Sequence, residues 1–317
     1  MGCSGISTKR IKTLTILDGF EDAENHPGVA HLIISKDNLI INGTENGYIK
    51  MYKIENSKLR EVYSNKEHNN SITCIVSLDS KRIISASMDN SIKIFERKNT
   101  SLSPIKSYLS YDNSVCKVLP LIDGNHFATC SMDQTIRIFK SKDPYEEVAK
   151  YEEEKSVLSI AQIETGIIGS VHRDGEKDEE SIVHFWSFKN KQLTKVHSIE
   201  ANQDFSPFFI WGMKKNKFAI SCSNYLLILN GNTYNQIKRI EEDWEVPCSS
   251  FFQLDDEYAY VACDGTFYQI LLVDYSCCFR EKKEEMDKES IISSSEDGSL
   301  IVTTKKDSLT LFKASFM

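Results

Sequence analysis

The residues with the most specific chemistry stand at the start of the chain, which reads Met1-Gly2-Cys3-Ser4. Once Met1 is removed, the amine of Gly2 can carry a myristoyl chain and the thiol of Cys3 a palmitoyl chain. Two chains matter because a single myristoyl group gives only marginal, reversible membrane binding. The pattern predicts lipidation at Gly2 and Cys3, and so a lipoprotein held at a cytoplasmic membrane face.

The residues that follow support this hypothesis only in part. Lys9, Arg10 and Lys12 would attract the segment to an anionic leaflet. However, Ile6 stands where the myristoylation motif usually has Ser or Thr. The alternative is an ordinary flexible tail over residues 1–8, on a protein that is cytoplasmic without a membrane anchor.

A second candidate for chemistry is the stretch that begins His172-Arg173-Asp174 and continues, rich in acids, to Glu180. These side chains suit acid–base catalysis, but three adjacent residues cannot converge on one reacting atom without partners from elsewhere. The chain also lacks a glycine-rich phosphate loop and the HExxH and GxSxG patterns. We therefore expect a protein that is not an enzyme, without catalytic or cofactor-binding residues.

The nine cysteines favour a structural role over a chemical one. They form no CxxC pair, and most lie in apolar stretches such as residues 72–76. This placement is typical of small buried side chains in a reducing compartment. Because the spacing of thiolate ligands is missing, we expect no metal ion and no other cofactor.

One motif recurs along the chain and shows how the chain is organised. Residues 85–95 read SASMDNSIKIF, residues 129–139 read TCSMDQTIRIF, and residues 42–52 repeat the pattern more faintly as NGTENGYIKMY. Each copy has a short β-type run, a polar pair suited to a tight turn, and alternating apolar residues that end on an aromatic one. This order predicts a strand, a hairpin turn and a second strand.

The last position of the motif, here called the closing residue, recurs seven times. The closing residues are Tyr52, Phe95, Phe139, Trp186, Leu229, Ile270 and Phe312. Their spacings are 43, 44, 47, 43, 41 and 42 residues, and the longest contains the turn His172–Glu180. A period of about 40–45 residues with four strands per unit indicates propeller blades. We predict an all-β fold, a seven-bladed β-propeller of four-stranded antiparallel blades.

These motifs make the chain similar to WD40-repeat proteins, most clearly in the second and third units. The resemblance implies that His68 lies near Ser85, Asp89 and Phe95. In that family the corresponding histidine, hydroxyl, aspartate and tryptophan form a hydrogen-bonded cluster that holds a turn against the strands. The chain departs from the pattern because no unit ends in Trp-Asp, and Phe95 has no indole donor.

Several units carry an aspartate in the turn between their second and third strands. We expect Asp89, Asp133 and Asp264 to stabilise these turns rather than to act on a ligand. Asp112 stands where the third unit should have its histidine. The cluster of that unit therefore departs from the family pattern.

The two ends of the chain are predicted to share one blade. Residues 9–17 alternate like a strand before the first full unit begins near Gly28. The seventh unit offers only three strands, at Ser290–Ser294, Ser299–Thr304 and Ser308–Lys313. Residues 9–17 would then complete the last blade and remove the two open edges of the array. This makes residues 9–317 one propeller domain after a tail of residues 1–8.

A propeller of this kind predicts which residues reach the surface. The turns between second and third strands emerge on the same face as the loops that join blades, and in WD40-repeat proteins this face commonly carries a partner. The expected partner-binding residues on it are Asn70, Asn113, His172, Arg173, Phe205 and Trp244. Arginine and aromatic residues are enriched at the energetic centres of interfaces. For Phe205 and Trp244 the alternative is packing beneath their own loops.

Composition limits the kind of partner. The 317-residue chain has a formal net charge of −8 and shows no basic stripe of the kind that a phosphate backbone requires. Direct binding of nucleic acid is therefore not expected. No apolar run approaches the length of about 18 residues that a membrane-spanning helix needs, and no apolar leader for secretion is expected.

Together these patterns predict a non-catalytic scaffold for protein–protein interaction. One alternative is a structural or substrate-receptor subunit of a larger complex, such as a coat or a ubiquitin ligase. A further alternative is an enzyme with a site in the central channel of the propeller. Sequence patterns do not separate the first two functions, because propellers serve unrelated processes.

Overall fold

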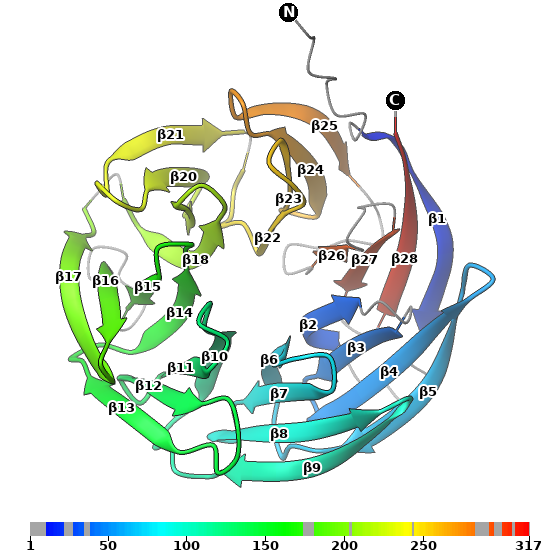
Figure 1. The fold of residues 1–317 in the computed structure, drawn as a ribbon. Helices are drawn as coiled ribbons and strands as arrows, with labels where there is room; N and C mark the ends of the chain where they lie inside the picture. Colours follow the sequence, from blue (N-terminus) through cyan, green and yellow to red (C-terminus); the bar gives the residue numbers. More distant parts are fainter. Residues whose placement is uncertain are drawn as a thin grey trace, which may run out of the picture.

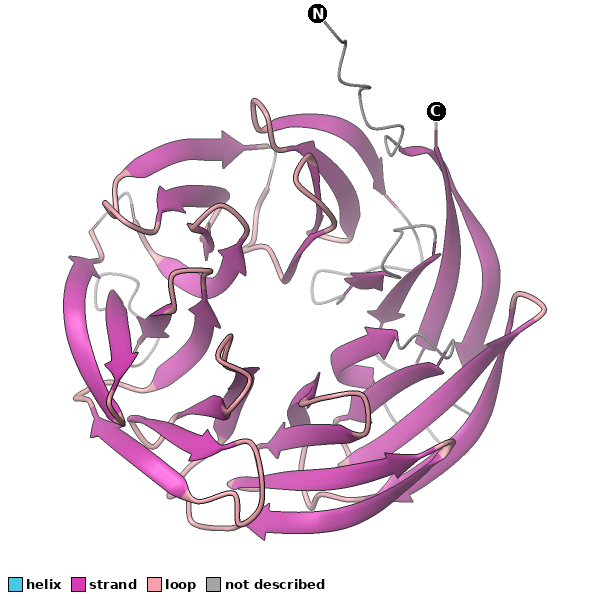
Figure 2. Cartoon of the chain, viewed as in Figure 1, coloured by secondary structure: helices cyan, strands magenta, loops and turns pink. Residues whose placement is uncertain are grey.

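The computed structural model describes residues 11–21, 28–34, 39–173, 181–202, 205–242, 244–282, 292–294, 300–305 and 308–316. These residues form the strands β1 to β28 and no helix. Accordingly, no described segment is a helix that could cross a membrane. The strands form four-stranded sheets arranged in a ring around a central opening (Figures 1 and 2).

Six sheets each consist of four consecutive strands, and we number these blades one to six. Blade one contains β2 (Gly28–Ile34), β3 (Leu39–Thr44), β4 (Tyr48–Glu55) and β5 (Lys58–Lys66). Blade two contains β6 (Ile72–Ser77), β7 (Arg82–Ser87), β8 (Ser91–Lys98) and β9 (Ser101–Tyr108). Blade three contains β10 (Val115–Pro120), β11 (His126–Ser131), β12 (Thr135–Lys140) and β13 (Glu147–Glu152).

The next three blades repeat this order. Blade four contains β14 (Val157–Gln162), β15 (Ile167–His172), β16 (Ile182–Lys189) and β17 (Gln192–Glu200). Blade five contains β18 (Pro207–Met213), β19 (Lys217–Cys222), β20 (Tyr225–Asn230) and β21 (Gln236–Glu241). Blade six contains β22 (Ser250–Gln253), β23 (Tyr258–Cys263), β24 (Thr266–Leu271) and β25 (Ser276–Lys282). In each blade the first strand lies nearest the central opening (Figure 1).

The remaining sheet joins the two ends of the chain. Its strands are β26 (Ile292–Ser294), β27 (Leu300–Lys305), β28 (Ser308–Phe316) and β1 (Ile11–Glu21). β1 pairs antiparallel with β28, from Ile11 opposite Phe316 to Glu21 opposite Ser308. Figure 1 shows β1 in blue beside β28 in red, on the outside of the ring. The predicted closure is confirmed, although the strand spans residues 11–21 instead of 9–17.

The pairing between the third and fourth strands has the same irregularity in blades one to six. The outer strand has one extra residue between the partner of the closing residue and the partner of the residue that precedes the closing residue. This extra residue forms a β-bulge. In blade two, Ile94 faces Lys106 and Phe95 faces Pro104, so Ile105 has no partner. A bulge bends its strand and increases the local twist, as an outer strand that curves around a ring requires.

The sheet that closes the ring has its bulge at the equivalent place. Phe312 faces Ile16 and Leu311 faces Asp18, which leaves Leu17 without a partner. The extra residues of the seven sheets are Leu17, Val62, Ile105, Val148, Val196, Ile237 and Cys278. β1 therefore has its bulge at the same place as the outer strand of every other sheet, and it has one further irregularity between Ile11 and Thr13.

The core lies between neighbouring blades, and the closing residues are part of it. All seven closing residues are buried, with at most 2% of their surface exposed. Between blades two and three, Ile84 and Ile94 belong to the same cluster as Val118 and Phe127. Because each large apolar side chain contributes about 1.5–3 kcal/mol when fully buried, the period of these residues fixes the period of the blades.

The structural role expected for the cysteines is confirmed for five of them. Cys74, Cys130, Cys222, Cys248 and Cys263 are at most 1% exposed, and all are free thiols. Burial raises the pKa of Cys74 to about 11 and that of Cys222 to about 12. Both of these thiols stay protonated at neutral pH, and all five buried cysteines pack as small apolar side chains.

Removing β1 should destabilise the whole ring. Deletion of residues 1–21 exposes the edge of β28, and we expect the melting temperature to fall by about 5 °C or more, because a loss of about 2 kcal/mol is enough for such a shift. Circular dichroism or differential scanning calorimetry measures this change. Deletion of residues 1–10, which leaves β1 intact, is the control and should melt like the full chain. Equal melting of the 1–21 deletion would contradict the closure.

Candidate functional site

The direction of the strands defines two faces of the ring. Because consecutive strands are antiparallel, the turns between second and third strands emerge on the same side as the loops that join blades. We call this side the turn face, and the other side the opposite face. All the residues predicted to bind a partner belong to segments of the turn face.

A buried cluster holds the turn face of blade two. Nδ1 of His68 lies 2.9 Å from Oδ2 of Asp89, and Nε2 lies 2.7 Å from Oγ of Ser85. Because a carboxylate only accepts, Nδ1 carries the proton and Nε2 accepts from the hydroxyl. The amide of Asn69 also donates to Asp89, at 2.9 Å. The predicted cluster of His68, Ser85 and Asp89 is confirmed, and it forms without an indole because Phe95 replaces tryptophan.

The surroundings of Asp89 keep its carboxyl group ionised. Burial by itself would raise the pKa, but hydrogen bonds from His68, from Ser91 and from the amide of Asn69 outweigh burial. The pKa of Asp89 therefore lies well below its usual range. These bonds fix the loop before blade two onto the turn of the same blade.

Blade three builds the corresponding contact from different residues. Oδ1 of Asp133 accepts from the amide and hydroxyl of Thr135, at 3.0 and 2.6 Å. Oδ2 accepts from Arg137 at 2.9 Å, and the guanidinium lies 4.2 Å from the centre of the Tyr111 ring. Asp112, which replaces the family's histidine, is exposed. The turn role of Asp133 is confirmed, with an arginine in place of the histidine.

The turn of blade six depends on backbone conformation. Asp264 and Gly265 join β23 to β24 as a two-residue turn between the paired residues Cys263 and Thr266. Their φ angles are 48° and 68°. Aspartate and glycine tolerate this left-handed region better than other residues do. The structural role predicted for Asp264 agrees with this geometry.

The prediction that His172 projects from a surface turn is wrong. His172 is the last residue of β15, pairs with Ile182 and is only 1% exposed. Its Nε2 lies 2.6 Å from Oγ of Ser170, and Nε1 of Trp186 donates to the same oxygen at 2.7 Å. The strand simply continues one residue further than the charged sequence suggests. Residues 174–180 of the predicted turn lie outside the described part of the chain.

Two aromatic residues predicted at the surface are also buried, so the alternative of packing beneath the loops holds. Phe205 is 7% exposed and joins the core between blades four and five. Trp244 is 5% exposed and meets the ring of Tyr268 edge-on, at 5.5 Å between centres. Arg173 is half-buried, with its guanidinium 4.3 Å from the centre of the Phe208 ring. Burial of a large aromatic ring is favourable even when the residue lies in a loop, because the ring removes a large apolar surface from water.

The two asparagines predicted to bind a partner are exposed. The Oδ1 atoms of Asn70 and Asn113 each accept the amide of the following residue at 2.8 Å, which fixes both side chains in their loops. Three apolar side chains lie exposed in the turns and loops of the same two blades: Met88 at 42%, Leu109 at 75% and Met132 at 37%. We call these five residues the turn-face patch. Sequence analysis missed the apolar three, although both methionines stand in the recurrent motif beside the turn aspartate.

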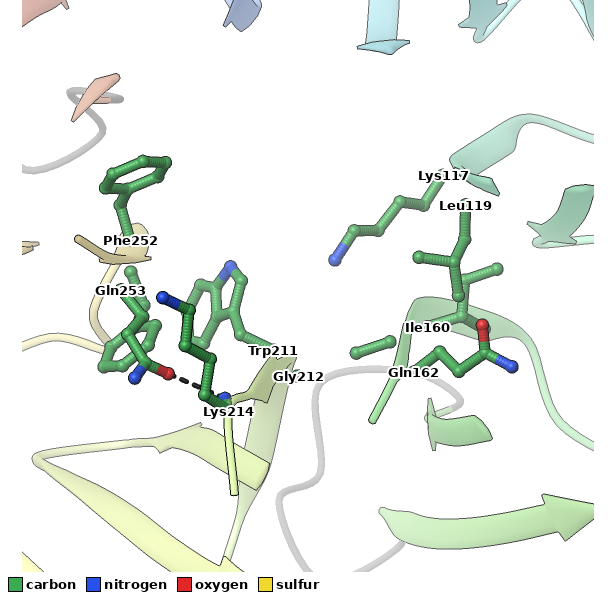
Figure 3. Close-up of a pocket in the computed structure, with 11 residues that line it drawn as sticks. Lys117, Leu119, Ile160, Gln162, Trp211, Gly212, Lys214, Phe252 and Gln253 are labelled. Atoms are coloured by element: carbon green, nitrogen blue, oxygen red, sulfur yellow. Dashed lines mark hydrogen bonds between the residues drawn. The ribbon is translucent and has the colours of Figure 1, made fainter. Parts of the chain in front are cut away.

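A pocket of about 370 Å³ lies between the inner strands of blades three to six. Figure 3 shows Lys117 extending from β10 on one side, with Trp211 and Lys214 on the other. β14 and β18 approach each other closely here. A Cβ atom added to Gly212 would lie only 1.9 Å from the carbonyl oxygen of Gln162. The pocket therefore needs glycine at this position.

The lining of this pocket limits its chemistry. Burial lowers the pKa of Lys117, whose Nζ lies 3.3 Å from the carbonyl oxygen of Ile210. The lining residues are otherwise apolar, apart from Lys214 and two glutamines, and include no carboxylate. Such a pocket can hold an anionic group with an apolar body, but its lining offers no acid–base pair.

Comparison with known families agrees with this geometry. Residues 59–96 and 102–140 each match the family model described as WD domain, G-beta repeat. The chain therefore contains WD40 repeats, and its structure is a β-propeller. No curated protein matches the sequence. WD40 propellers are typically non-catalytic scaffolds that bind other proteins.

The WD40 repeats and the blades of the propeller are offset by one strand. The match at residues 59–96 begins in β5 of blade one and ends in β8 of blade two. The match at residues 102–140 likewise runs from β9 to β12. Each repeat thus supplies the outer strand of one blade and three strands of the next, and β1 stands in the same relation to β28.

Neutralising Asp89 should destabilise the protein in a pH-dependent way. At pH 7 we expect Asp89→Asn to lower the free energy of unfolding by about 1–3 kcal/mol, because buried donors lose their partner. The pKa of Asp89 is lowered by folding, so its contribution is present above the unfolded value of about 4 and is lost as the pH falls further. Urea unfolding of the wild type and the variant between pH 7 and pH 3 should therefore show a shrinking difference.

The matched control for this experiment is Asp112→Asn, at the exposed aspartate that precedes blade three. Exposed substitutions away from such networks usually change stability by less than about 0.5 kcal/mol. A difference between Asp89→Asn and wild type that stays constant down to pH 3 would contradict the role of the ionised carboxylate.

Proposed function

We propose that this WD40 propeller is a non-catalytic scaffold that binds another protein through the turn-face patch. The observation that carries the proposal is the exposure of Met88, Leu109 and Met132 in the turns and loops of adjacent blades. Apolar side chains exposed on one face of a soluble protein form an interaction site when a partner covers them together. Methionine is suited to such sites because its flexible, polarisable side chain adapts to a partner.

The rigid support of the patch favours the same function. The amide of Met88 donates to the carbonyl of Ser71 at 2.8 Å, and that of Met132 to the carbonyl of Ser114 at 2.9 Å. The turns are therefore held against the loops that precede their blades. A surface fixed in this way loses little conformational entropy when a partner binds.

We further propose that acyl chains on Gly2 and Cys3 hold the scaffold at a cytoplasmic membrane face. The direction of β1 supports this arrangement. β1 begins opposite Phe316, at the opposite face, and runs toward the turn face. The segment from Gly2 to Ile11 can span about 30 Å when extended. A membrane anchor would thus attach to the face away from the turn-face patch, which stays open to a partner.

The partner surface is tested with charge substitutions on the two faces. The double variant Met88→Glu/Met132→Glu should lose the proteins that co-purify with the wild type, because desolvating two carboxylates opposes binding. The control Ile122→Glu/Val273→Glu changes side chains that are 61% and 78% exposed, in turns of the opposite face. Quantitative mass spectrometry of affinity-purified samples compares the three proteins. Equal retention of partners by both double variants would contradict the proposed surface.

The membrane anchor is tested separately. Gly2→Ala removes the glycine that the myristoylation motif requires and should move the protein from the membrane to the soluble fraction. Cys3→Ser should release it only in part, because one myristoyl chain still gives weak, reversible binding. Fractionation of cells that express each variant measures both effects. Unchanged fractionation of Gly2→Ala would exclude the anchor and leave the scaffold proposal intact.

A further inference from the structure

A compact group of ligand-type side chains lies at the seam between blades three and four. Glu153 follows β13, whereas His172 ends β15 and His184 lies in β16. One donor atom from each of these residues lies within 4.8 Å of the other two. Among the residues that the structure describes, this is the group with the composition and spacing of a metal site. No partner-binding or turn-stabilising role described above uses all three residues.

Lys195 of β17 shows where the lone pairs of this group point. Its Nζ lies 2.8 Å from Oε1 of Glu153 and 3.2 Å from Nε2 of His184. An ammonium group only donates, so Nε2 of His184 is unprotonated and its lone pair faces the ammonium. Nδ1 of His184 then carries the proton and donates to Oγ of Ser198 at 2.8 Å. A cation therefore already occupies the point on which these two side chains converge.

The third member of the group has an unused nitrogen. Nδ1 of His172 is buried and has no hydrogen-bond partner of normal geometry, although the Lys155 backbone is close enough to act on its pKa. Ser170 holds the other ring nitrogen, and its hydroxyl can also donate to the carbonyl of His184 at 3.4 Å. With that rotamer, Ser170 accepts from Nε2–H of His172, and Nδ1 keeps a lone pair for a ligand. In the other tautomer Nδ1–H faces the backbone carbonyl of Lys155, and metal binding replaces that contact. A buried nitrogen without a partner calls for a ligand.

We propose that Glu153, His172 and His184 form a binding site for a divalent transition-metal ion, Zn²⁺, which displaces the ammonium group of Lys195. Two imidazoles and one carboxylate are a frequent ligand set for zinc and leave a fourth position open. The other ring nitrogens donate hydrogen bonds to Ser198 and Ser170, and these bonds fix the orientation of both ligands. The bound ion would link blade three to blade four.

The geometry of the group suits this ion. Burial, followed by the charge of Lys195, lowers the pKa of His184 to about 4. Burial also holds the pKa of His172 well below its usual range. Donor atoms around tetrahedral zinc are about 3.3 Å apart. Nε2 of His184 lies 3.7 Å from Oε2 of Glu153, and the donor atoms of the three residues all lie within 4.8 Å of one another. The side chain of Lys195 is 31% exposed and can swing into solvent.

Metal titration of four purified proteins tests the proposal. After removal of metal by dialysis against a chelator, Co²⁺ is added and its visible absorption reports four-coordinate binding, and Zn²⁺ is then used as a competitor. Lys195→Met removes the competing cation and should bind Zn²⁺ at least about tenfold more tightly than the wild type. His184→Gln should bind at least about tenfold more weakly than the wild type.

His197→Gln is the matched control. This histidine lies in β17, two residues after Lys195, but it is exposed, and its ring stacks on that of Tyr234 with 4.4 Å between ring centres. It should bind like the wild type. All four proteins keep the same cysteines, so binding to thiols cancels in the comparison. Circular dichroism confirms that each variant is folded. Equal affinity of His184→Gln and wild type, or no tighter binding by Lys195→Met, would overturn the proposal.

Discussion

The ring depends on one constraint, the pairing of each outer strand with the third strand of its sheet, with a bulge beside the closing residue. The bulge bends the outer strand, and the closing residue opposite it is buried against the neighbouring blade. β1 obeys the same constraint although nearly the whole chain separates it from β28. The offset between WD40 repeats and blades follows from this pairing, because each repeat leaves its outer strand in the preceding blade. Closure of the ring thus leaves no described sheet without its outer strand.

Within this frame, the contacts that fix the turns are interchangeable. Blade two uses a histidine between a serine and Asp89, whereas blade three pairs Asp133 with Arg137. Blade four joins Trp186 to Ser170, with His172 on the same hydroxyl. In each of these contacts a donor is paired with an acceptor, as buried polar groups require. The backbone therefore keeps its course while the residue types change from blade to blade.

The backbone is regular whereas the side-chain contacts vary, and this difference explains which features could be predicted from the sequence. The strands follow from the spacing of the closing residues and from alternation, so the hairpins predicted at residues 85–95 and 129–139 are found in β7–β8 and β11–β12. The cluster around His68 is implied by the resemblance to WD40-repeat proteins. The burial of His172 could not be predicted, because a histidine at the end of a strand and one at the start of a charged loop look alike in sequence. Likewise, the contact between Glu153, His184 and Lys195 joins two blades, and no local pattern marks such contacts.

The most direct test of the account is amide hydrogen exchange across the ring closure in the full-length protein. If β1 is the outer strand of the last sheet, peptides from residues 11–21 and 308–316 should exchange as slowly as those from the outer and third strands of blade six, β25 and β24. Rapid exchange of residues 11–21, at the rate of an unstructured peptide, together with loss of protection in β28, would contradict the closure and the scaffold built on it.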